Sequence, residues 1–119
     1  MCPDRGSVTI WSAALAGLVW LGASAAAVYG AAVTGRHRAE AAADLAALAA
    51  AVHVPDGTAA ACAVGGRIVA RNGGAMRECR VVGTDVEVVA STRVNLGGLG
   101  SFTALARARA GPVEVGGLP

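Results

Sequence analysis

The chain has 119 residues, a formal net charge of +2, ten arginines and no lysine. This length allows one small domain, and the near-neutral charge with scattered arginines excludes a typical nucleic-acid-binding protein. A domain of this size buries a modest core, so we expect it to depend on a disulfide, a membrane anchor or a partner.

The first predicted element is a membrane-spanning helix. No charged residue occurs between Arg5 and Arg36. A bilayer core about 30 Å thick needs about 20 helical residues, so the sequence predicts a transmembrane helix over residues 7–35. The alternative is a cleaved signal peptide, but its apolar region would be only about 7 to 15 residues long. Small residues at a spacing that lets two helices approach closely in lipid mark one face of this helix: Gly22, Ala26 and Gly30.

A stalk helix is predicted to continue the span over residues 36–54. This segment holds strong helix formers and no breaker before Pro55, so span and stalk are expected to form one helix. Leu45, Leu48 and Val52 form an apolar stripe along it. We expect this stripe to pack against the following helix or a hairpin, because an exposed stripe would promote association.

A second helix is predicted over residues 58–71. Residues 56–58 offer capping side chains before it, and the Asn-Gly-Gly segment at 72–74 offers a stop. Gly65 and Gly66 weaken the helix by on the order of 1 kcal/mol each relative to alanine. We therefore expect the helix to depend on packing, with its backbone close to the stalk.

A hairpin follows the second helix. Residues 76–82 and 84–94 show strand patterns, and Gly83 with Thr84 suits a two-residue turn. That turn places Arg80 opposite Glu87 on the outer side and turns Cys79 inward.

Residues 102–110 are predicted to form a third strand after a glycine-rich loop. Alanines alternate there with Arg107 and Arg109. A helix is the alternative, since alanine, leucine and arginine all favour it. The tail from Gly111 has no periodic signal and is expected to be loose. The predicted fold class is α+β, with a small domain over residues 55–119 that carries the short helix on an antiparallel sheet of two to three strands.

Cys62 and Cys79 are predicted to form a disulfide. Cys62 lies in the second helix and Cys79 on the inward face of the first strand, so a helix packed on the hairpin would bring them together. The alternative is two buried free thiols, as is common in a cytosolic core. The disulfide is expected to persist only if the domain is exported.

No catalytic, cofactor-binding or metal site can be named from the sequence. Both histidines, His37 and His53, lie on the stalk without a spaced set of ligand partners. Residues 97–100 are rich in glycine but lack the helix and lysine of a phosphate-binding loop. We therefore expect no enzyme activity, no cofactor, no small-molecule substrate and no nucleic-acid partner.

Three features resemble actinobacterial TadE-like proteins encoded near a helicase and secretion genes, which are relatives of the TadE minor pseudopilins of Flp pilus systems. They are the segment DRGSVT at 4–9, the segment RHRAEAAADLAALAA at 36–50, and the spaced pair Cys62 and Cys79. The resemblance extends over nearly the whole chain, as far as residue 112.

The resemblance implies a single-pass protein of the plasma membrane that acts in pilus assembly or secretion. It implies a cytoplasmic N-terminus, an exported domain, and a leader over residues 1–6 that a prepilin-type peptidase removes between Gly6 and Ser7. The implied partners are the lipid bilayer and other pilus or secretion membrane proteins. The alternative is a free-standing single-span protein whose exported domain binds or stabilises a membrane partner.

Two features depart from this pattern. Pilin-like proteins carry a glutamate five residues after the cut, where this chain has Trp11. A carboxylate in lipid pairs with a neighbouring subunit's amine, so its absence counts against incorporation into a filament. Arg36 and Arg38 also outweigh Arg5, which by the positive-inside rule alone would invert the topology.

Overall fold

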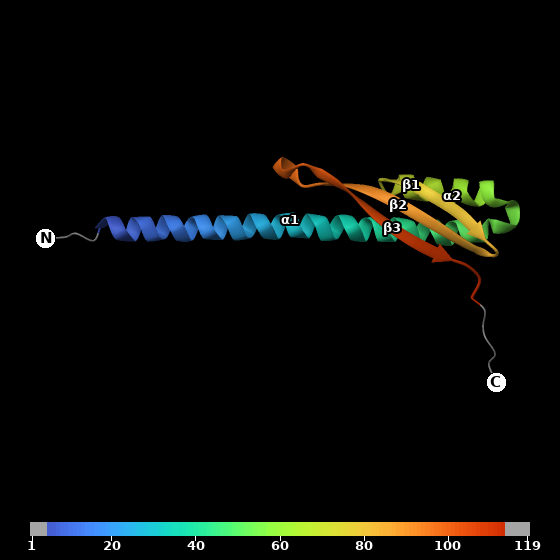
Figure 1. The fold of residues 1–119 in the computed structure, drawn as a ribbon, viewed down its shortest axis with the longest axis horizontal. Helices are drawn as coiled ribbons and strands as arrows, with labels where there is room; N and C mark the ends of the chain where they lie inside the picture. The colour runs from blue at the N-terminus through green and yellow to red at the C-terminus, as the bar shows by residue number, and fades with distance from the viewer. Residues whose placement is uncertain (1–4, 114–119) are drawn as a thin grey trace, which may run out of the picture.

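The computed structural model describes residues 5–113 and has the predicted α+β architecture (Figure 1). A long helix is followed by a short helix and then by three consecutive strands. The predicted leader up to residue 4 and the predicted loose tail from residue 114 lie outside the described residues. The elements in chain order are α1 (Arg5–Val52), η1 (Val54–Asp56), α2 (Thr58–Arg71), β1 (Gly74–Val82), β2 (Asp85–Asn95), η2 (Gly97–Leu99) and β3 (Ser101–Ala110).

Helix α1 is continuous over 48 residues, so the predicted span and stalk form one helix. At 1.5 Å per residue it is about 72 Å long. It is long and apolar enough to cross a membrane. Every described side chain from Gly6 to Ala27 is exposed, whereas the C-terminal half of the helix lies along the sheet (Figure 1). The helix therefore has a free half and a packed half.

The three strands form one antiparallel sheet in the order β1-β2-β3. The predicted turn is present, with Gly83 at φ +64°, a value that glycine adopts without steric cost. The register is also as predicted, since Arg80 pairs with Glu87 and Cys79 with Val88. A bulge in β1 shifts the register between Met76 and Glu78.

Residues 101–110 form a strand and not the alternative helix. Strand β3 pairs with β2 without interruption, from Val86 opposite Ala110 to Asn95 opposite Ser101. The alternation of side chains between the two faces of a strand explains this outcome, because it buries Ala104 and Ala106 and leaves Arg107 and Arg109 exposed. A helix would have spread the arginines around the core-facing side.

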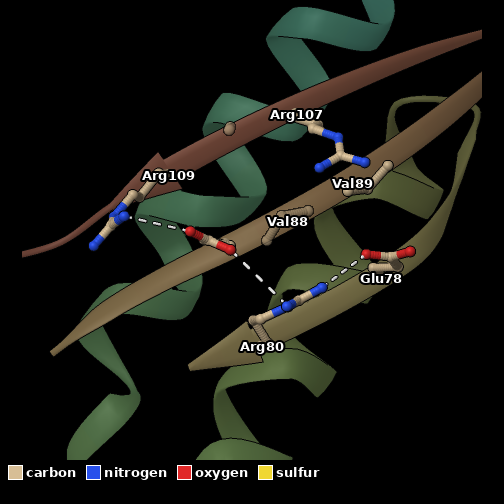
Figure 2. Close-up of a pocket in the computed structure, with 8 residues that line it drawn as sticks. Glu78, Arg80, Val88, Val89, Arg107 and Arg109 are labelled. Carbon is tan, nitrogen blue, oxygen red and sulfur yellow. Dashed lines mark hydrogen bonds and ion pairs between the residues drawn. The ribbon is translucent and has the colours of Figure 1, made fainter. Parts of the chain in front are cut away.

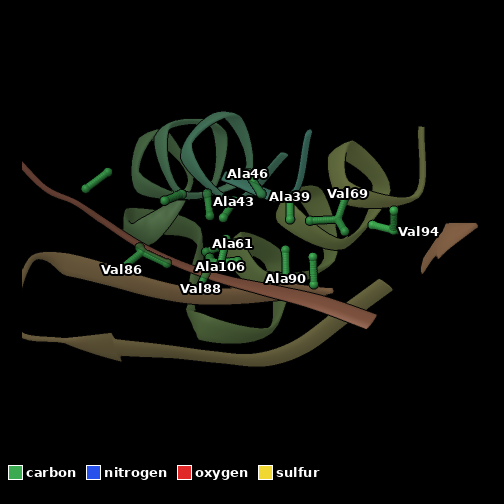
Figure 3. Packing of buried hydrophobic residues seen from close by; sticks show 14 residues of the cluster. Ala39, Ala43, Ala46, Ala61, Val69, Val86, Val88, Ala90, Val94 and Ala106 are labelled. Atoms are coloured by element: carbon green, nitrogen blue, oxygen red, sulfur yellow. The ribbon is translucent and has the colours of Figure 1, made fainter. Parts of the chain in front are cut away.

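The core is built mainly from alanine and valine between α1, α2 and one face of the sheet (Figure 3). Strand β2 contributes Val86, Val88 and Ala90, and α2 contributes Ala61 and Val69. Small side chains let the helices lie close to the sheet and to each other. The buried residues of α1 form one face of small side chains: Ala39, Ala42, Ala43, Ala46, Ala47 and Ala50.

The prediction that Leu45, Leu48 and Val52 pack inward is wrong. These side chains are 50%, 60% and 76% exposed, respectively. They lie on the face of α1 opposite the alanines, because helical geometry allows only one of the two faces to meet the sheet. The smaller residues occupy the interface, and the larger stripe is left uncovered.

Helix α2 has the predicted bounds but a different N-terminal cap. Gly57 is the N-cap residue at φ +105°, and no side chain from residues 56–58 makes a capping hydrogen bond. Asp56 instead belongs to η1, where its backbone N–H donates to the His53 carbonyl at 3.0 Å. The turn from η1 into α2 therefore depends on the positive φ of Gly57, a backbone conformation that strains residues other than glycine.

Candidate functional site

The outer face of the sheet carries a charged cluster that surrounds a hollow of about 230 Å³ (Figure 2). Glu87 on the central strand β2 lies between Arg80 of β1 and Arg109 of β3, at 3.9 Å and 3.4 Å. Arg109 also pairs with Asp85 at 2.7 Å, and Arg80 with Glu78 at 3.3 Å.

This cluster tethers the strands to one another. Its side chains are substantially solvent-exposed, and ion pairs of that kind contribute at most about 1 kcal/mol each. No nucleophile and general base lie together in it, so its geometry offers no recognisable reaction. Among residues 5–113 no group of three potential metal ligands is found either.

The predicted disulfide is present between Cys62 of α2 and Cys79 of β1. Their Cα atoms are 5.9 Å apart, which is within the usual range for a bridge. Both residues are partly buried at the junction of α2 with the sheet. The bond therefore joins the short helix to the first strand.

The predicted helix-pairing face begins on the free half of α1 and reaches the junction with the sheet, where Gly30 lines a hollow together with Arg93 of β2. Gly22, Ala26 and Gly30 are exposed, and no other described side chain approaches Gly22 or Gly30 within 4 Å of a Cβ position. Pairing through this face therefore stays a prediction. The predicted processing residues, Gly6 and Ser7, lie in the first turn of α1, and cleavage between them also stays a prediction.

A cluster of titratable groups marks the point where α1 reaches the sheet. Arg36 Nε donates to Glu40 Oε1 at 3.1 Å, and His37 Nδ1 lies 3.2 Å from Glu40 Oε2. The hydrogen bond from Arg36 is the largest cause that holds the pKa of Glu40 below its usual value, and His37 adds to it. Glu40 is therefore ionised over the whole neutral range.

Two hollows separate α1 from the ends of β2 and β3. One is lined by Gly30, Thr34 and Arg38 of α1 together with Arg93 and Asn95 of β2. The other is lined by Tyr29 and Arg36 of α1 together with Phe102 and Leu105 of β3. Between them Gly35 lies tightly against Val94, where a Cβ would clash with the valine side chain.

Local sequence patterns predict no contact between the residues of this junction. Arg93 lies far from Arg38 in the chain, and Phe102 lies far from Tyr29. Only the packing of β2 and β3 on α1 brings each pair into one hollow. One sequence signal was available. No acidic residue occurs between Glu87 and Glu114, although the arginines continue through this stretch.

Comparison with known proteins gives a match for the helical half of the chain. Residues 6–53 match the family model described as "Putative Flp pilus-assembly TadE/G-like". A Mycobacterium tuberculosis protein named apoptosis inhibitor Rv3654c is 60% identical over 55 residues, which cover 43% of this chain and 61% of that relative. The aligned stretch thus spans less than two thirds of the relative's length. No solved structure matches the chain significantly.

The matched residues coincide with α1, which holds the free apolar half and the alanine face of the core. They include the segment 36–50, which carried most of the resemblance in the sequence. The resemblance to TadE-like proteins is therefore confirmed over residues 6–53, which match the TadE/G-like family model.

Proposed function

We propose that this chain is a membrane-anchored, non-catalytic component of a pilus-assembly or secretion system. The observation that carries the proposal is the match of residues 6–53 to the TadE/G-like family, on a helix whose free half is long enough to cross a bilayer. A protein that acts by assembly needs surfaces that contact other proteins and does not need a reactive site. The uncovered stripe of Leu45, Leu48 and Val52 offers such a surface beyond the free half.

The disulfide supports an exported domain. Bridges of this kind persist outside the reducing cytoplasm, so Cys62–Cys79 favours a domain outside the plasma membrane and a cytoplasmic N-terminus. Arg36 and Arg38 oppose this orientation under the positive-inside rule. An introduced cysteine, Arg107→Cys in a Cys2→Ser background, tests orientation through an impermeant thiol label on whole cells. Labelling supports the exported domain, and absence of labelling supports the inverted topology.

Assembly is tested by site-specific crosslinking in the native host. A photoreactive residue at Leu48 is expected to crosslink to other components of the Flp pilus or secretion machinery, whereas the same residue at Arg107, on the outer face of the sheet, serves as the control. Mass spectrometry of the mature N-terminus is expected to find Ser7 as the first residue. An unprocessed N-terminus without crosslinks to that machinery contradicts the proposal.

The second candidate function is a free-standing single-span protein whose domain binds a membrane partner. Trp11 favours it, because that position lacks the carboxylate that pilin-like subunits pair with a neighbour's amine. This candidate predicts an intact N-terminus and crosslinks from Leu48 to a membrane protein outside the pilus machinery.

A further inference from the structure

The connection between β2 and β3, residues 96–100, is an apolar tip with the sequence Leu-Gly-Gly-Leu-Gly. Leu99 is 74% exposed there. Several backbone groups of the tip are already hydrogen-bonded, since Leu96 N–H donates to Gly100 O and Gly97 N–H donates to Asn95 Oδ1, both at 2.8 Å. Moving such a loop from water into an apolar layer costs little free energy. Burial of its apolar surface is favourable, and these backbone polar groups already have hydrogen-bond partners.

The tip lies at the end of the sheet that extends toward the free half of α1, and its flanking residues Asn95 and Phe102 line hollows that α1 also lines. Figure 1 shows the ends of β2 and β3 reaching along α1 toward its free half. Tyr29 and Phe102 line one hollow at this junction. Residues 7–27 precede the first partly buried position of α1, and at 1.5 Å per residue they measure about 31 Å, close to the thickness of a bilayer core. A bilayer around these residues ends at the level of the tip.

The charged residues of the domain are distributed as expected for a tip at a membrane surface. Asp85, Glu78 and Glu87 lie at or toward the β1–β2 turn, whereas no acidic residue occurs from 88 to 113. Arg38 and Arg93 line the hollow beside the tip, and neither has an ion-pair partner within the described part of the chain. Free arginines next to an apolar tip match the layering of a membrane surface, where anionic headgroups lie above acyl chains.

We propose that the β2–β3 tip inserts into the surface of the same bilayer that α1 crosses. Leu99 enters the apolar layer, Tyr29 and Phe102 lie at the interface, and Arg38 and Arg93 contact lipid phosphates. The proposal rests on the proposed anchoring by α1 and holds for either orientation of the domain. Two contacts with the membrane fix the tilt and rotation of the domain, and with them the direction in which the Leu45–Leu48–Val52 stripe faces its partners.

The test measures the depth of a tryptophan in vesicles that contain brominated phosphatidylcholine. The full chain carries Leu99→Trp in a Trp11→Phe, Trp20→Phe background, so that the tip holds the only indole. We expect brominated lipid to remove most of its emission. The matched control carries Thr84→Trp at the opposite end of the sheet, and its emission is expected to persist.

A chain that keeps Trp20 separates failure of this inference from failure of the proposed function. Quenching of Trp20 without quenching in the Leu99→Trp variant overturns the inserted tip and leaves the anchor intact. An unquenched Trp20 overturns both, because α1 is then outside the bilayer. Quenching in the Thr84→Trp control equal to that in the Leu99→Trp variant also overturns the proposal, since the domain would then lie flat on the membrane.

The arginines are tested in the same vesicles with and without phosphatidylglycerol. Quenching in the Leu99→Trp variant is expected to increase with the anionic lipid. Adding Arg38→Gln and Arg93→Gln is expected to abolish this increase, whereas Arg107→Gln on the outer face is expected to retain it. An increase that survives loss of both Arg38 and Arg93 overturns their assignment to lipid phosphates.

Discussion

Gly65 of α2 lies against the backbone of Ala46 in α1, so closely that a Cβ on Gly65 would stand 3.3 Å from the Ala46 carbonyl oxygen. The same Cβ would lie 2.9 Å from Met76 Cε. This contact brings the two helices together without an intervening side chain. It explains a glycine in the middle of α2, where glycine otherwise weakens a helix.

Gly65 and Gly66 are predicted to respond differently to alanine. Gly66→Ala is expected to raise the free energy of unfolding by about 1 kcal/mol, because its Cβ would meet nothing within 4 Å. Gly65→Ala is expected to bring no gain, and Gly65→Leu to cost about 2 kcal/mol, because added atoms must displace Ala46 or Met76. Thermal unfolding of the full chain in detergent checks all three variants. Equal gains at both positions would contradict the close contact.

The two faces of α1 are predicted to differ in the same assay. Ala46→Leu is expected to lower the free energy of unfolding by about 1–3 kcal/mol, because it overpacks the alanine face. Leu48→Asp is expected to change it by less than about 0.5 kcal/mol, because that side chain is exposed. Protease resistance of the purified variants provides a second measurement. Loss of folded protein in Leu48→Asp would show that the stripe is covered.

The stalk shows why the sequence predicted the elements better than their packing. Local signals at residues 56–58, at Asn72 and at Gly83 predicted the bounds of the second helix and the hairpin turn, and the turn fixed the register, although the N-cap of the helix proved to be Gly57 and not a side chain. Hydrophobicity ranks leucine above alanine, so it selected Leu48 and not Ala46 as the buried residue. The distance between α1 and the sheet decides that choice, and only tertiary packing sets this distance.

The same distinction separates the disulfide from the β2–β3 tip. Cys79 could be placed inward because its register follows from a two-residue turn. The position of the β2–β3 tip relative to the free half of α1 depends on how far β2 and β3 extend along a helix that is distant in sequence (Figure 1). No local pattern contains that information.

Glu40 is predicted to titrate below the usual range of a glutamate. Arg36 lowers the pKa of Glu40 in the folded state. The ionised Glu40 therefore contributes to the stability of the fold at pH values above its unfolded-state pKa, and this contribution is lost as the pH falls through its folded-state pKa. Arg36→Gln is expected to raise the pKa of Glu40 toward its ordinary value, and His37→Asn to raise it less. Carboxyl NMR titration measures the shift. Arg38→Gln is the control, since Arg38 makes no contact with this carboxylate among the described interactions. A Glu40 pKa that is unmoved by Arg36→Gln would contradict the assignment.

The disulfide is predicted to be the largest single contribution to the stability of the domain. Cys62 and Cys79 are 17 residues apart, and closing a loop of that size stabilises a fold by about 3 kcal/mol in the chain-entropy model. The core offers little to replace it, because its largest fully buried side chains are valines. Small domains have total stabilities of only about 5–15 kcal/mol, so loss of the bond removes a large fraction.

Denaturant unfolding of the full chain in detergent, with and without a reductant, measures this contribution. Reduction is expected to lower the free energy of unfolding by about 3 kcal/mol. The variant with Cys62→Ala and Cys79→Ala is expected to match the reduced protein and to be insensitive to the reductant, which excludes an effect through Cys2. Thiol labelling must show that the bond has been broken in the reduced sample. An unchanged unfolding midpoint in such a sample would show that α2 is held on the sheet by the alanine contacts alone.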